Sequence, residues 1–123
     1  MTLPVAQPGA PLVAAKALRR AADVLQLSQA EVAGIVGASA ASVSRTFAGE
    51  RGLDVQSAEG RLALLFLRVF RSLDALVGGD AAKARLWLRA DNRHLGAAPL
   101  SLLALPQGLV RVADYLDAFR GRL

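Results

Sequence analysis

The stretch SQAEVAGIVGASAASVSRTF, residues Ser28–Phe47, has the pattern of two short helices joined by a tight turn. Ala33 supplies a small side chain where two steeply crossing helices approach each other, and Gly37, four residues later, tolerates the positive φ of such a turn. Val43 follows six residues after this glycine and suits the inner face of the second helix. The spacing therefore predicts a helix-turn-helix, whose second helix commonly enters the DNA major groove.

Apolar residues recur at helical spacing on both sides of this stretch, and no alternating run bounded by hairpin turns predicts a strand. We therefore expect an all-α protein. Ser28 and Glu31 have the spacing of a capping box, and Pro11 suits the first turn of the preceding helix. That helix has an inner stripe of Leu12, Ala15, Leu18, Ala22 and Leu25. The predicted helices span residues 11–26, 28 to the turn at 37, 39–48, 56–77, 81–90, 100–104 and 107–120.

The composition changes near Val55, which predicts an N-terminal helix-turn-helix unit packed on a small C-terminal helical unit. We assign residues 11–55 to the first unit and residues 56–123 to the second. Residues 1–10 contain two prolines and neither a basic segment nor a long apolar run, so we expect a flexible arm and not a signal peptide. The longest apolar run, residues 62–70, is interrupted by an arginine and is too short for a membrane span of about 20 residues.

The composition narrows the possible kinds of site. The chain of 123 residues is 54% hydrophobic and has no cysteine, which excludes disulfides, thiolate metal sites and a cysteine nucleophile. Its net charge of +5 favours acidic partners, but residues 1–55 carry five cations and four anions, a net of +1. Charge alone therefore does not argue for DNA binding. The lack of cysteine is compatible with a reducing compartment, and we expect a cytoplasmic protein.

Several side chains of the helix-turn-helix are candidate DNA contacts. Arg45 can form a bidentate pair of hydrogen bonds with the edge of a guanine. Gln29 lies at the start of the first helix of the pair, so its side-chain amide and the N-terminus of that helix can both bind a phosphate. A plain structural corner is the alternative. Because the second helix has mostly small side chains, useful affinity would require a dimer or a larger assembly. Lys16, Arg19 and Arg20 are additional candidate phosphate contacts. The predicted DNA-binding residues are Gln29, Ser39, Ser42, Ser44 and Arg45.

Residues 84–123, taken by themselves, predict a small helical bundle that needs no binding site. Pro99 and Pro106 mark helix starts, while Gly96 and Gly108 suit a turn or a close approach between chain segments. The expected core residues are Leu86, Trp87, Leu102, Leu103, Leu109, Val112, Leu116 and Phe119.

No constellation of residues points to an enzyme, because the chain has neither a glycine-rich phosphate loop nor a Ser/His/Asp arrangement. Asp114 and Asp117 share a helix face that Arg111 and Arg120 extend, so ion pairing along this helix is the simpler account of the two carboxylates. The single histidine, His94, has no cysteine or acidic cluster nearby. We therefore expect a solvated loop residue at this position, no metal site and no cofactor.

A particular order of residues runs through the C-terminal unit. It consists of Trp87-Leu88, Asn92, Leu95-Gly96, Pro99-Leu100, Leu102-Leu103, Gly108, Val112, Leu116 and Gly121. This order resembles the toxin-binding domain of the Xre/MbcA/ParS antitoxin family over roughly residues 80–121, so we place that domain at about residues 80–123. The resemblance implies a RES-domain toxin as partner, an enzyme that depletes NAD. It also implies that the antitoxin blocks the NAD pocket of this toxin and binds operator DNA to repress its own operon.

Two segments are candidate toxin contacts under this resemblance. One is the polar turn, with Asn92, Arg93 and Leu95. The other is the C-terminus, with Arg120, Gly121, Arg122 and Leu123. The α-carboxylate of Leu123 is a candidate plug for the anion site of an NAD pocket. A frayed basic tail is the alternative, because two arginines fit a cationic pocket poorly.

A second functional interpretation is a stand-alone helix-turn-helix regulator whose C-terminal bundle only dimerises. Under either interpretation we expect at least a homodimer, or a higher hetero-oligomer with toxin, because the apolar content is high for this length. Leu64, Leu67 and Phe70 lie either on a dimer face or in the core of one chain. A toxin gene beside this gene, and a co-purifying product, would separate the two interpretations.

Overall fold

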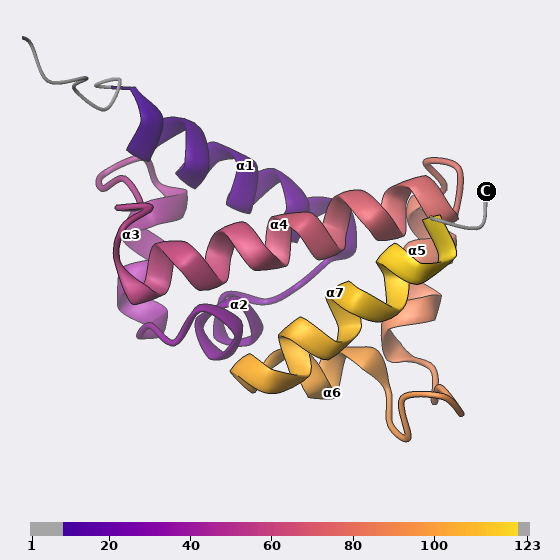
Figure 1. Cartoon of the computed structure of the whole chain (residues 1–123). Coiled ribbons are helices and arrows are strands. Elements are labelled where there is room, and N and C mark those ends of the chain that lie inside the picture. Colours follow the sequence, from indigo (N-terminus) through magenta and orange to yellow (C-terminus); the bar gives the residue numbers. More distant parts are fainter. Residues whose placement is uncertain (1–8, 121–123) are drawn as a thin grey trace, which may run out of the picture.

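The computed structural model describes residues 9–120, and every named element within this range is a helix (Figure 1). This confirms the all-α prediction. The helices are α1 (Ala10–Leu25), α2 (Gln29–Val36), α3 (Ala40–Phe47), α4 (Ala58–Leu76), α5 (Ala81–Arg89), α6 (Pro99–Leu103) and α7 (Pro106–Arg120). The predicted boundaries differ from these by at most two residues. None of these seven helices is long and apolar enough to cross a bilayer.

The helix-turn-helix is formed by α2, a turn at Gly37, and α3. The Ser28 Oγ accepts a hydrogen bond from the Glu31 N–H at 3.0 Å, and the Glu31 carboxylate accepts one from the Ser28 N–H at 2.9 Å. These two bonds complete the predicted capping box. Gly37 has a φ of +71°, while Ala33 and Val43 are buried. The three positions that predicted this unit therefore have the structural roles expected of them.

Helix α4 passes through the middle of the molecule, with α1 on one side and α7 on the other (Figure 1). Phe66, Val69 and Leu73 of α4 are fully buried, and Leu109 and Val112 of α7 are buried with them in the same core. The apolar run of residues 62–70 is therefore the central helix of the fold. The α2–α3 pair covers one end of α4, and α5 lies near the other end.

Two residues that we expected in the core are exposed. Leu12 is 50% exposed, because the first turn of α1 borders a hollow beside the end of α3 instead of facing the core. Leu86 is 71% exposed, because Ala84 and Leu88 form the buried face of α5 and a residue midway between them points outward. Both expectations were wrong. Of the other core candidates, Trp87, Leu102 and Phe119 are partly buried, and Leu103, Leu109, Val112 and Leu116 are buried.

The carboxylates of α7 find their cationic partner on another helix. Arg68 of α4 donates to the Asp117 carboxylate through Nε at 2.9 Å and also through Nη2, and lies 3.8 Å from Asp114. The buried Ser72 hydroxyl donates to the second Asp117 oxygen at 3.0 Å and accepts from Arg120 at 3.2 Å. The hydrogen bond from Arg68 lowers the pKa of Asp117. The expected ion pairs along α7 are thus replaced by a clamp between α4 and α7.

Candidate functional sites

The start of α3 uses two of the predicted DNA contacts to stabilise the helix itself. Ser39 is the N-cap of α3, and its Oγ accepts a hydrogen bond from the Ser42 N–H at 3.1 Å. The same hydroxyl donates to the Ser42 Oγ at 3.0 Å, and Ser42 is only partly exposed. An N-cap orients the first turn of a helix, so these two serines position α3 while still lying close to its exposed face.

Two other predicted contacts come together from different helices. Gln29, the first residue of α2, and Ser44 of α3 line one shallow hollow, together with Arg19 and Asp23 of α1. Gln29, Ser44 and Arg45 are all exposed, and Arg45 lies in the last turn of α3. The geometry therefore offers an amide, a hydroxyl and a guanidinium on the exposed side of the α2–α3 pair.

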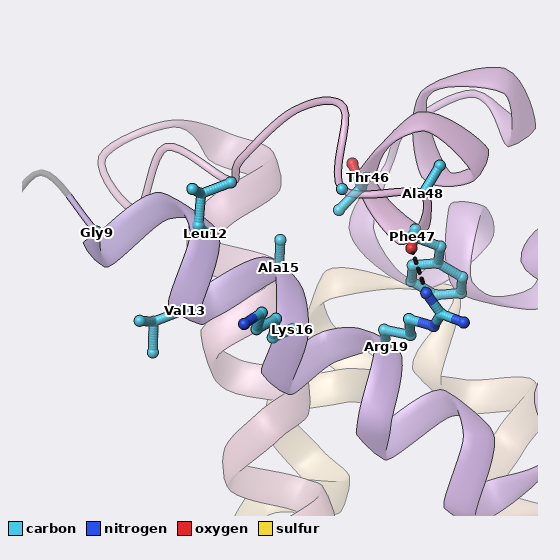
Figure 2. Close-up of a pocket in the computed structure, with 10 residues that line it drawn as sticks. Gly9, Leu12, Val13, Ala15, Lys16, Arg19, Thr46, Phe47 and Ala48 are labelled. Atoms are coloured by element: carbon cyan, nitrogen blue, oxygen red, sulfur yellow. Dashed lines mark hydrogen bonds between the residues drawn. The ribbon is translucent and has the colours of Figure 1, made fainter.

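The three cations of α1 do not act alike. The Arg19 Nη1 donates to the Phe47 carbonyl at 2.7 Å, so this side chain caps the end of α3 (Figure 2). Lys16 lines a hollow of about 410 Å³ between α1 and the end of α3, the same hollow that Leu12 borders (Figure 2). Arg20 lies beside α4 and α5, in a cavity with Phe70. Only Arg19 is thus placed beside Gln29 and Ser44.

An ion pair that the sequence did not predict joins the helix-turn-helix to the C-terminal unit. Arg89 of α5 donates to both Glu31 carboxylate oxygens at 3.2 Å, and this hydrogen bonding lowers the pKa of Glu31. The neighbouring Arg85 donates to the Val24 carbonyl at 2.9 Å. Because Glu31 and Arg89 are 58 residues apart, no local pattern signals this contact.

The polar turn of residues 91–98 is a defined structure and not a loose loop. The Asn92 side-chain oxygen accepts from the Leu95 N–H at 3.1 Å, and the Asn92 carbonyl accepts from the Gly96 N–H at 2.8 Å. Gly96 has a φ of +78°, which explains the glycine there. Leu95 is only 3% exposed, so its side chain anchors the turn in the core. Of the predicted contacts in this turn, Arg93 is exposed and Asn92 is partly exposed.

Arg111, which we expected to form ion pairs along its own helix, instead fixes the turn of residues 91–98 to α7. Arg111 donates to the carbonyls of Leu95 at 2.9 Å and His94 at 3.1 Å. His94 is exposed as expected, but its ring centroid lies 6.0 Å from that of Tyr115. Tyr115 also lies 5.0 Å from Phe119 and 6.3 Å from Trp87, measured between ring centroids. The spacing of four between residues 111, 115 and 119 is the sequence signal for this shared face.

The second predicted toxin contact begins where α7 ends. Arg120 is exposed at the last position of α7 and also reaches Ser72, whereas Gly121, Arg122 and Leu123 lie outside the described residues. Within residues 9–120, no group of three or more His, Asp or Glu side chains is placed to hold a metal ion.

Comparison with known protein families gives two matches that together span most of the chain. Residues 6–68 match the antitoxin Xre-like helix-turn-helix domain, and residues 72–122 match the antitoxin Xre/MbcA/ParS C-terminal toxin-binding domain. No curated protein matches the chain. The first match covers α1 to the middle of α4, and the second covers the end of α4 to α7. The chain therefore belongs to the Xre/MbcA/ParS family of antitoxins, with a helix-turn-helix domain followed by a toxin-binding domain.

Proposed function

We propose that this antitoxin binds a RES-domain toxin in the cytoplasm, blocks the active site at which that toxin depletes NAD, and represses its own operon. The observation that carries the proposal is the presence of a helix-turn-helix and a toxin-binding domain in one chain. The proposed division places DNA contacts in residues 11–55 and toxin contacts in about residues 80–123.

The proposed toxin contacts lie on the turn of residues 91–98 and at the end of α7. Arg93 is exposed on a turn that Asn92 and Arg111 hold in shape, so the turn meets a partner with little loss of conformational entropy. Leu95 supports this contact from the core. Gly121, Arg122 and Leu123, which lie outside the described residues, are also proposed toxin contacts, with the Leu123 carboxylate as the group proposed to enter the NAD pocket.

We expect a RES-domain toxin gene beside this gene, and co-expression with its product tests the proposal. We expect the full chain to restore growth and cellular NAD, and to co-purify with the toxin. A chain lacking Arg122 and Leu123 tests the C-terminal carboxylate in the same assay, because equal neutralisation would exclude the plug. Growth arrest despite expression of the folded full chain, with no co-purifying toxin, would favour the stand-alone regulator.

We propose that DNA is read by the exposed side of the α2–α3 pair. Arg45 is the strongest donor for a base edge, while Gln29 and Ser44 lie together and suit a phosphate. Ser39 and Ser42 hold the first turn of α3 in place. Because one guanidinium per copy provides little specificity, the proposal includes a homodimer, or a hetero-oligomer with toxin, that reads repeated half-sites.

Replacing Arg45 by alanine should weaken binding to the promoter DNA of this operon by about tenfold or more, because one lost base contact costs about 1–3 kcal/mol. Fluorescence anisotropy at fixed salt measures the affinity, and a scrambled duplex measures the sequence preference. Arg93→Ala is the matched control, since it removes the same charge from an exposed site in the toxin-binding domain. Equal behaviour of the two variants would show that α3 does not read the bases.

A further inference from the structure

A small hollow opens between α7 and the turn of residues 91–98. It has a volume of about 160 Å³ and is lined by His94, Tyr115, Ala118 and Phe119. Among the described residues that line it, His94, Tyr115 and Phe119 are aromatic, and the Tyr115 ring centroid lies 6.0 Å from that of His94 and 5.0 Å from that of Phe119. The hollow therefore lies where the two predicted toxin-contact segments, the polar turn and the end of α7, come together.

We propose that this hollow is the anchor site of the toxin interface and receives one apolar or aromatic side chain of the toxin. The inference rests on the proposed function and deepens it, because it names where and by what chemistry the partner docks. Residues 72–122 match the toxin-binding domain, and all four residues that we name around the hollow lie within this range. The tightest contacts of protein interfaces are commonly such pockets, filled by a single anchor side chain.

The size of the hollow selects its occupant. A pocket for a drug-sized ligand has a volume of ~300 Å³ or more, whereas 160 Å³ suits one side chain. Aromatic walls favour an apolar or aromatic group, which stacks on the rings or meets their edges. Ala118, which also lines the hollow, is small and exposed, so it leaves room for a partner side chain.

The hollow is also held in shape before the partner arrives. Arg111 fixes the carbonyls of His94 and Leu95, and the turn that carries His94 is closed by the hydrogen bonds of Asn92. The opposite wall belongs to α7, which the Arg68–Asp117 clamp fastens to α4. A rigid pocket avoids the entropic cost of ordering flexible side chains on binding.

Charges around the hollow point to an acidic rim on the partner. Arg93 precedes His94 in the turn and is exposed, and Arg111 donates to backbone carbonyls, which carry no net charge. Asp114 and Asp117, the carboxylates of the same helix, face Arg68 instead. The toxin surface around the anchor side chain should therefore carry carboxylates, which would meet Arg93 and Arg111.

A series of substitutions at Ala118 tests the inference, because this residue is exposed and can be enlarged at little cost to folding. With purified co-encoded toxin, Ala118→Ser should retain the affinity of the unmodified chain, Ala118→Leu should lower it, and Ala118→Trp should lower it by about tenfold or more. Isothermal titration calorimetry gives the affinities, and thermal unfolding followed by circular dichroism shows whether each variant is folded. Ala41→Trp is the matched control, since it places the same indole on an exposed site of α3.

The outcomes separate the inference from the proposed function. If the unmodified chain binds the toxin and the affinity of Ala118→Trp is within twofold of it, the anchor site is overturned and the proposed function stands. Failure of the unmodified chain to bind the toxin would overturn both. Should Ala118→Trp unfold, the Leu variant decides, because it also fills the hollow and should weaken binding measurably.

Discussion

Replacing Gly108 by alanine should lower the free energy of unfolding by about 3 kcal/mol, because a side chain there has no room. Gly108 lies in the first turn of α7, and a Cβ atom on it would lie 2.1 Å from the Leu102 carbonyl oxygen of α6. Backbone cannot move aside as a flexible side chain can, so the α6–α7 junction would have to open. Urea unfolding followed by circular dichroism would show the loss as a lower midpoint.

Gly34→Ala is the matched control for this prediction. Gly34 lies inside α2, and a Cβ atom on it would meet only the Ala104 Cβ, at 4.0 Å, which is an ordinary contact. Alanine favours helix over glycine by about 1 kcal/mol, so this variant should be as stable as the unmodified chain or more stable. The same shift of the midpoint in both variants would contradict the packing argument for Gly108.

Replacing Phe66 by alanine should destabilise the protein by about 3–5 kcal/mol, the range for removing a buried aromatic side chain. Phe66 is the largest of the fully buried side chains and belongs to α4, which contacts α1, α2, α5 and α7. Its removal would leave a cavity at the centre of the core. Since small proteins are stable by only about 5–15 kcal/mol, much of the stability would be lost.

Leu64→Ala gives the comparison for Phe66→Ala on the same helix. Leu64 is 42% exposed and two residues away, so its truncation should cost about 1 kcal/mol or less. Chemical denaturation measures both variants under identical conditions. A large loss from Leu64→Ala would indicate that this side chain is buried in a dimer, which is one of the two roles we considered for it.

The turn and the helix cap of the helix-turn-helix were predictable, because each depends on residues that are close together in the sequence. Gly37 is needed for a positive φ, and the capping box of Ser28 and Glu31 is satisfied within one helical turn. Leu12 and Leu86 were misplaced because apolar residues occur on more than one face of their helices. Only the packing of neighbouring helices determines which of those faces is buried.

The candidate sites were predictable in part, for the same reason. The turn of residues 91–98 stands out by its polarity, and Arg45 by its place on α3. The contacts of Arg68 with Asp117 and of Arg89 with Glu31 join residues 49 and 58 positions apart, so only the docked helices bring these partners together. Tyr115 was not among the predicted site residues, because its contact with His94 depends on how α7 packs against the turn.

The contact between Arg89 and Glu31 has a consequence for how assemblies are spaced. Glu31 lies in the first turn of α2, two residues after Gln29, and Arg89 ends the helix that leads into the turn of residues 91–98. This ion pair and the shared core therefore join the two proposed binding surfaces within one fold. Under the proposed function, the spacing of the half-sites on DNA would then set the spacing of the toxin molecules that neighbouring copies bind.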